Sequence, residues 1–479
     1  MSLPKKSCVM IAGMVASFAR SLQTSLVHII YNEHELGNYP YHKTRTKTRT
    51  REIEQWALAK GRPVARQKMT KQEKSWIKYD VGNSAFVLLS SALIPVYFSS
   101  IATGSVVVAW GYAETIASLI AAVLMPILGS LADIRGNKKK FLVGFIGTGV
   151  VACAALGIPS QALPFLIIYV LAAVSLNSSM VFYDAFLVDT TTEARYDEVS
   201  SQGYAWGYIG SCIPFIACLI VVLGGSAVGI DAVLGMKIAF IITALWWAAF
   251  SFPLIRNVHQ GHFKERGADL FKETFVGLGR TCKSIAQDKR LLFFMLAFFF
   301  YIDGVHTIIK MATSYGTDLG IDSVQLVLAL LVTQFVAFPS ALVYGRFATK
   351  VGTRKMLLIS VFAYGCITLF AAFLLKSAVE FWILAICVGL FQGGIQALSR
   401  SEFGKLIPKQ RANEYFGFFD IFGKYAAVMG TALVSIVTQL TGNPSAGVLS
   451  VGVLFVIGFV LLWKMPEGKS AEKSPSLLS

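Results

Sequence analysis

The stretch GSLADIRGNKK at residues 129–139 decides the fold, because it returns in altered form as GRFATKVGTRK at residues 345–355. The two stretches align without gaps at an offset of 216 residues (345 − 129). The same offset aligns three further pairs: Arg195 with Arg411, Glu198 with Glu414, and Gly207 with Gly423. Several matches at one offset indicate an internal duplication, which is the pattern of a chain built from two similar halves.

Twelve apolar stretches surround these two segments. They lie at 79–101, 106–130, 140–158, 163–187, 202–224, 232–255, 291–314, 324–347, 356–375, 378–399, 415–439 and 446–464, and a helix needs about 20 such residues to cross a membrane. Of the 479 residues, 55% are hydrophobic and 15% charged, whereas a soluble domain carries about 25% charge. The sequence therefore predicts an all-α membrane protein with twelve transmembrane helices in two six-helix pseudo-repeats.

The basic residues gather in alternate connections between these stretches. Between residues 79 and 464, most of the Lys and Arg lie in the segments 135–140, 195–198, 256–290, 346–355 and 400–411. Cytoplasmic loops of membrane proteins are enriched in Lys and Arg, so these connections and both termini are predicted to lie in the cytoplasm. This asymmetry accounts for the formal net charge of +16, from 43 basic and 27 acidic residues, without a nucleic-acid partner.

The chain divides into five predicted parts: a cytosolic extension at 1–74, a six-helix half at 75–255, a linker at 256–290, a second half at 291–465 and a cytosolic tail at 466–479. The polar composition of 42–74 is typical of a flexible segment. Residues 9–30 fit an amphipathic interfacial helix, and a translation start near Met69 is an alternative. The linker predicts a second amphipathic helix, along the membrane surface, from Leu270, Phe271, Phe275, Leu278 and Ile285.

Four motifs carry a resemblance to a known family. The stretch at 129–139 resembles the signature loop of the major facilitator superfamily, and its second copy has Thr349 where the first has Asp133. Three more motifs resemble one branch, the vacuole effluxer-like transporters and their bacterial permeases: YDVGNSAF at 79–86, VFYDAFL at 181–187 and GGIQALSRS at 393–401. The resemblance covers about residues 75–465.

The resemblance implies transport of small solutes, and amino acids are the substrates of the fungal members of the branch. It also implies that the signature loop braces the two halves, with Asp133 near the start of the eleventh span. A carboxylate is favourable at a helix N-terminus, because the helix dipole is positive there. Gly129 and Gly136 would let the backbone turn and approach a neighbour closely.

Asp303 is the clearest candidate for a substrate or proton site. It lies about 18 Å along the seventh span, near mid-depth, and His306 and Lys310 follow on the same helical face. Ionisable groups inside a membrane usually face a cavity or a partner. A static pair of Asp303 with His306 or Lys310 is the alternative.

Several neutral polar residues are weaker candidates for binding a zwitterionic solute. Asn83 and Ser84 lie in the first span, Asn177 in the fourth, and Gln392 and Gln396 form a polar stripe with Arg400 in the tenth. All of them equally suit hydrogen bonds between helices. Asp80, at the start of the first span, is expected to cap free backbone N–H groups.

The duplication also predicts where the two halves meet on the cytoplasmic side. At the offset of 216, Asp184 corresponds to Arg400 and Asp189 to Lys405. Equivalent positions approach each other across a pseudo-two-fold axis, so these opposite charges are expected to form bridges that close this side. Ordinary enrichment of basic residues at cytoplasmic helix ends is the alternative for Lys405.

Motifs of other function classes are missing from the sequence. It has no G-x-x-x-x-G-K-[ST], H-E-x-x-H or G-x-S-x-G, and its seven cysteines form no CxxC pair. We therefore expect no enzyme activity, no cofactor and no metal site. The sequence predicts a secondary transporter for a small polar solute in a bacterial plasma membrane, with lipid and small molecules as partners. Coupling to protons and simple uniport are both open, and a non-transporting receptor or assembly protein is the alternative.

Overall fold

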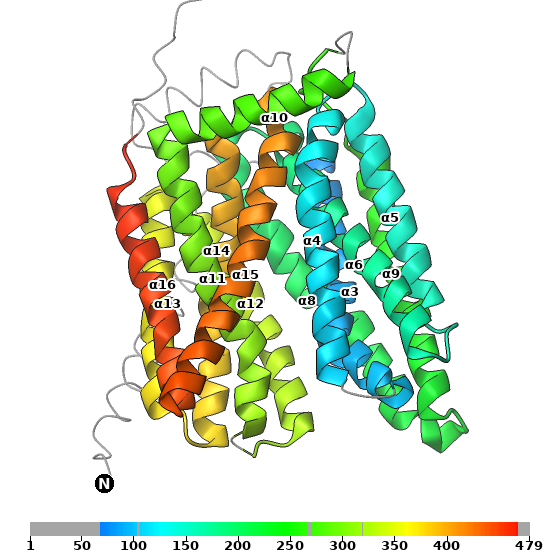
Figure 1. The fold of residues 1–479 in the computed structure, drawn as a ribbon. Coiled ribbons are helices and arrows are strands. Elements are labelled where there is room, and N and C mark those ends of the chain that lie inside the picture. Colours follow the sequence, from blue (N-terminus) through cyan, green and yellow to red (C-terminus); the bar gives the residue numbers. More distant parts are fainter. Residues whose placement is uncertain (1–67, 103–105, 266–269, 319, 468–479) are drawn as a thin grey trace, which may run out of the picture. The chain divides into compact units, whose positions relative to one another are not determined.

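The computed structural model of the protein describes residues 68–102, 106–265, 270–318 and 320–467. Twelve long helices form two groups of six (Figure 1). The first half comprises α3 (Lys71–Ile101), α4 (Val106–Ala132), α5 (Asn137–Ala155), α6 (Ala162–Ala185), α8 (Tyr196–Gly224) and α9 (Ala232–Asn257). The second comprises α11 (Lys289–Asp318), α12 (Ser323–Val351), α13 (Thr353–Leu374), α14 (Ala378–Leu406), α15 (Ala412–Thr441) and α16 (Pro444–Lys464). The predicted twelve-helix architecture is confirmed.

Eleven of these helices have the length and composition to cross a membrane within the described residues. The twelfth, α5, has 19 residues and carries three consecutive lysines in its first turn, which lower its mean hydropathy. Large apolar side chains point outward along the bundle, such as Val96, Ile220 and Phe362, each more than 60% exposed. Exposed apolar side chains along spanning helices suit contact with lipid.

Several helices extend beyond the apolar stretches that predicted them. Helix α3 begins at Lys71 rather than at 79, because Thr70 and Glu73 form a capping box ahead of the apolar run. Helix α14 continues to Leu406 rather than to 399. The predicted boundary of the N-terminal extension at residue 74 therefore falls inside α3. The predicted interfacial helix at 9–30 lies outside the described residues.

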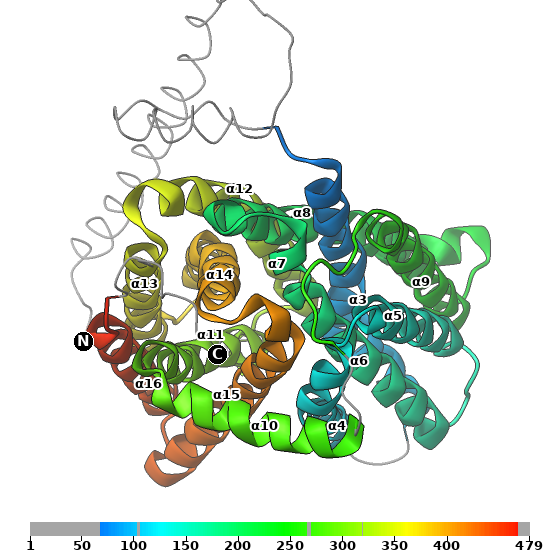
Figure 2. The same ribbon diagram turned by 90° about the horizontal axis from the view of Figure 1, so that it is seen from above.

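We call the end of the bundle that carries the charged connections the basic side. Here the two halves pack closely, with α4 against α15 and α8 against α12 and α14 (Figure 2). A Cβ atom on Gly129 would lie 2.5 Å from the carbonyl oxygen of Asn413. A Cβ atom on Gly345 would lie 2.6 Å from Cβ of Ser201 and 3.3 Å from the carbonyl oxygen of Asp197. Since 345 − 129 and 413 − 197 both equal 216, the duplication relates these two contacts.

The linker between the halves crosses the basic side. Helix α10 (Leu270–Gln287) packs against α4 and α11, as Figure 1 shows. It buries Thr274, Thr281 and Ile285, whereas Phe275 is 58% exposed. Helix α10 therefore uses a partly polar face toward the protein and leaves an aromatic ring free on its outer face.

Residues 258–265 attach the linker to the first half. The carboxamide of Gln260 accepts a hydrogen bond from the Gly136 N–H and donates to the carbonyl oxygens of Ala132 and Asp133. The backbone of Lys264 pairs with Asp133 and Arg135. The linker is thus fixed to the signature loop before it reaches the second half.

Candidate functional site

Arg400 is the centre of the contact between the halves on the basic side. It lies on α14, and its side chain is 1% exposed. Its Nη1 lies 2.9 Å from Oδ1 of Asp184, its Nη2 lies 3.4 Å from Oδ2 of Asp80, and its Nε donates to the Ser200 hydroxyl. All three partners belong to the first half. The guanidinium is therefore held by side chains from the opposite half of the duplication.

Three aromatic rings surround the same guanidinium. The Cζ atom of Arg400 lies 4.6 Å from the ring centre of Trp76, 4.3 Å from that of Tyr204 and 5.3 Å from that of Tyr183. Cation–π attraction is stronger when the cation is desolvated, as here. Tyr183 also donates a 2.6 Å hydrogen bond to Asp80. We call these residues (Trp76, Asp80, Tyr183, Asp184, Ser200, Tyr204 and Arg400) the Arg400 cluster.

The second predicted bridge, between Asp189 and Lys405, is wrong. Asp189 instead lies 2.7 Å from Lys138 of its own half and accepts hydrogen bonds from the backbone of Gly261 and His262. Lys405 bridges the halves through a different acid, with its Nζ 2.7 Å from Asp197 at the start of α8. Asp189 and its equivalent Lys405 do not pair because Lys138, within the first half, lies next to Asp189 and neutralises it.

Asp133 faces the N-terminus of α15. Its Oδ1 accepts hydrogen bonds from the backbone N–H of Asn413 (2.9 Å) and from the Asn413 side chain (2.8 Å), and its Oδ2 accepts one from the Glu414 N–H (3.0 Å). The side chain is buried. A carboxylate here satisfies N–H groups that the first turn of a helix leaves unpaired. Among the described residues, the hydroxyl of its equivalent Thr349 donates to the carbonyl of Arg346 within its own helix and does not reach the other half.

Burial raises the pKa of the Asp133 carboxyl to about 6, against the opposing effects of Lys264, Lys138 and the hydrogen bonds from Asn413. If the basic side opens, the carboxyl meets water and its pKa falls toward the ordinary value. The closed side then holds the proton more tightly, so closure is favoured at low pH and loses this contribution as pH rises through about 6.

We expect acidification from about pH 7.5 to about pH 5 to raise the closed-to-open ratio roughly tenfold through Asp133. The measurement is the reactivity of a cysteine placed between the halves at Ser201, a buried residue. Asp133→Asn should remove this component of the pH response. An unchanged response in Asp133→Asn would assign it to another titrating group.

Asp303 lies at mid-depth and is fully buried. Its Oδ1 accepts a 2.8 Å hydrogen bond from the backbone N–H of Gly430 on α15 and a longer one from Thr307. Its Oδ2 is buried without a hydrogen-bond partner among the described residues. Among the described residues, the hydrogen-bond partners of Asp303 are Gly430 and Thr307. The static pair with His306 or Lys310 that was the alternative for Asp303 is therefore not formed there.

The neutral candidates occupy different settings. Asn83 donates hydrogen bonds to the Tyr79 carbonyl and to Asp80, and so helps to position Asp80 in the Arg400 cluster. Ser84 packs on Gly207 of α8, and Gln396 accepts a 3.0 Å hydrogen bond from Tyr208 across the halves. Asn177 is half-buried on α6. Gln392 instead borders a separate small cavity of about 50 Å³ between α11, α12 and α14.

Sequence reasoning missed two acids of this site. Asp80 does not cap a helix, because α3 begins at Lys71 and places Asp80 inside the bundle, beside Arg400. Asp197 was not a candidate, yet it holds Lys405 and accepts a hydrogen bond from Thr353. The offset of 216 could have found it, since Asp197 is the equivalent of Asn413, which contacts Asp133.

These contacts can be compared with known proteins. A family model described as "Vacuole effluxer Atg22 like" matches residues 91–189 and 188–474. The chain belongs to this family. A relative from Bacillus subtilis, the uncharacterized MFS-type transporter YxiO, is 44% identical over 418 residues, which cover 85% of this chain and 97% of the relative.

Fungal members of the Atg22-like family are more distant. Autophagy-related protein 22 of Cryptococcus neoformans is 28% identical over 290 residues, which cover 56% of this chain and 50% of the relative. The chain thus spans about half the length of the fungal relatives that it matches.

Solved structures share the fold of the family. The human organic anion transporter MFSD10 superposes with a TM-score of 0.65 at 13% identity, covering 82% of this chain and 99% of that one. The transporter FucP superposes with a TM-score of 0.63 at 12% identity, covering 83% and 98%. The fold is that of the major facilitator superfamily, and the protein is a multi-pass membrane protein of a secondary-transporter family.

Proposed function

We propose that the protein moves small zwitterionic solutes, with amino acids as the leading class, across a bacterial plasma membrane by alternating access. The observation that carries this proposal is the position of Arg400. A buried cation of the second half is bonded to Asp80, Asp184 and Ser200 of the first half. These bonds must break when the halves separate on the basic side, and side chains on both halves then lose their partners. Such an interface favours two discrete arrangements, which alternating access requires.

Basic loops are cytoplasmic by the positive-inside rule, so the described conformation is closed toward the cytoplasm. The relative in Bacillus subtilis supports a bacterial plasma membrane. Solute recognition is assigned to mid-depth groups on both halves. Asp303 offers an unpartnered carboxylate oxygen, which suits a substrate ammonium or a proton. His306, Asn83, Ser84, Asn177, Gln392 and Gln396 are the further candidates for contact with the solute.

Uptake into proteoliposomes tests this function. We expect labelled amino acids to enter vesicles that contain the protein, faster with an imposed pH gradient. In Asp303→Asn, the gradient-driven component should fall at least about tenfold, because the amide cannot exchange a proton at neutral pH. Asparagine keeps the oxygen that accepts from Gly430, so the variant should fold.

Asp231→Asn is the matched control. Asp231 caps α9 on the side away from the basic loops, and Asn caps helices equally well. Uptake without a response to the gradient would identify a uniporter and remove the proton from the proposal. A well-folded protein that moves no amino acid, sugar or peptide would favour a non-transporting receptor.

A further inference from the structure

Three consecutive lysines at the start of α5 meet three different environments. Lys138 is buried and bonds Asp189 and the carbonyl oxygen of Ala185. Lys139 lies 3.4 Å from Nδ1 of His259. Lys140 is exposed, and among the described residues it has neither an ion pair nor a hydrogen bond from its side chain. A single free ammonium group therefore remains on the outer face of this helix.

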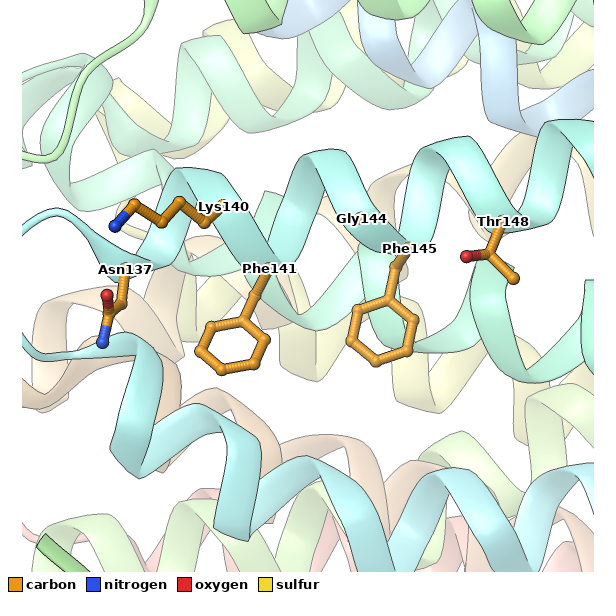
Figure 3. A pocket seen from close by; sticks show the side chains of 6 residues that line it. All are labelled: Asn137, Lys140, Phe141, Gly144, Phe145 and Thr148. Carbon is orange, nitrogen blue, oxygen red and sulfur yellow. The ribbon is translucent and has the colours of Figure 1, made fainter.

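Lys140 stands at the head of a surface groove of about 450 Å³. The groove is lined by one face of α5: Asn137, Lys140, Phe141, Gly144, Phe145 and Thr148 (Figure 3). Phe141 and Phe145 both stack on the buried ring of Phe182, with ring centres 5.8 Å apart in each case. This packing fixes the two aromatic side chains, so the apolar wall of the groove is preformed. Added atoms at Gly144 would have open space, because a Cβ there meets nothing within 4 Å.

The duplication provides an internal comparison for this face. The six residues 216 positions later are all buried in the second half: Thr353, Met356, Leu357, Ser360, Val361 and Tyr364. Tyr364, the equivalent of Thr148, stacks on Phe455 of α16. Its large ring fills space that Thr148 leaves open, and Lys140 stands where the second half has the apolar Met356. The second half covers this face with its own side chains, whereas the first half leaves it open.

We propose that the groove binds one phospholipid with an acidic head group, from the leaflet on the basic side. Lys140 would pair with the head group, while Phe141, Gly144 and Phe145 would hold an acyl chain. From residue 137 to residue 148 the helix rises about 16 Å, which is about half of the hydrocarbon thickness of roughly 30 Å. The groove therefore has the depth of a single leaflet. Arg135 adds positive charge at the same end, although Glu265 lies 4.0 Å from it.

Native mass spectrometry of the detergent-purified full chain tests this site, with phosphatidylglycerol and phosphatidylcholine as probes. We expect one tightly held phosphatidylglycerol per wild-type chain. Gly144→Leu should fill the groove and lower this occupancy about tenfold. Gly147→Leu is its control, since Gly147 is exposed on the same helix, has the same open space and does not line the groove. Lys140→Gln should reduce the preference for the acidic lipid about fivefold. Lys355→Gln, at an exposed lysine in the first turn of α13, should leave this preference unchanged.

Each other result overturns part or all of the proposal. Equal phosphatidylglycerol occupancy in Gly144→Leu and wild type would show that lipid binds elsewhere. Loss of binding in Gly144→Leu with an unchanged head-group preference in Lys140→Gln would disprove the role of Lys140. A wild-type dimer that Gly144→Leu converts to monomer would assign the groove to a second copy of the chain. Thermal unfolding of each variant, measured beside wild type, separates these outcomes from misfolding.

Discussion

Arg400→Gln is expected to open the basic side of the protein. The substitution leaves the buried Asp80 and the partly buried Asp184 without their cation, and breaking a buried ion pair costs about 3–5 kcal/mol. In the open arrangement both carboxylates can meet water, so the variant should favour that arrangement. A cysteine in place of the buried Ser201 should then react with a membrane-impermeant maleimide from the basic side. We expect this reaction to be at least about tenfold faster than in the Ser201→Cys protein that keeps Arg400.

A second variant distinguishes opening from misfolding. Arg400→Gln combined with Asp184→Asn removes an unpaired charge together with its partner, so labelling should return part of the way to the wild-type rate. Asp80 keeps its hydrogen bonds from Tyr183 and Asn83 in the double variant, so Asp80 itself is not substituted. Lys350→Gln, at an exposed lysine of α12, is the matched control. Unchanged labelling in a folded Arg400→Gln protein would disprove the gating role of the Arg400 cluster.

Gly129→Ala is expected to prevent full closure of the same side. Its new methyl group would meet the backbone of Asn413 at 2.5 Å from the carbonyl oxygen, and backbone atoms cannot move away by changing rotamer. Overpacking of this kind costs about 1–3 kcal/mol, here only in the closed arrangement. Labelling at Ser201→Cys should rise about tenfold, and solute uptake should fall by a similar factor.

The duplication supplies a second glycine, Gly345, at which the same substitution can be compared with Gly129→Ala. Gly345→Ala adds a methyl group against Cβ of Ser201, on the related contact between α12 and α8, so it should also disfavour closure. Because its reporter cannot be Ser201, the measurement for this variant is uptake. Gly147→Ala, in open space on α5, should behave as wild type. If Gly129→Ala transports and labels as wild type does, the close approach of α4 to α15 is not required for closure.

Much of the fold could be predicted, because hydropathy and the charge of the connections are local properties of the sequence. The twelve spans and their two-half arrangement follow from them and from the offset of 216. The helix ends could not be predicted so well, since caps such as Thr70 extend helices into polar sequence. Within the site, the offset brought Asp184 to Arg400, and the structure places them 2.9 Å apart.

The other contacts of the site join residues that are far apart in the sequence, and no regular spacing along the chain indicates them. Lys138 lies next to Asp189 only because α5 packs on α6, and that pairing leaves Lys405 for Asp197. Asp80 meets Arg400 across 320 residues of chain. The aromatic rings around Arg400 come from three helices of the first half, and an aromatic residue in a membrane span does not by itself indicate a cation nearby.

Glu414 connects the remaining contacts of the basic side to one another. Its buried carboxylate bonds Lys264 of the linker, Thr281 of α10 and Arg411, while its backbone N–H bonds Asp133 of the signature loop. Withdrawal of α15 therefore breaks contacts to the loop, the linker and α10 in one event, and the loss of one contact weakens the next. In the proposed transport cycle we therefore expect this side to open cooperatively, because an intermediate with half of the contacts broken would carry a buried, partly unpaired carboxylate.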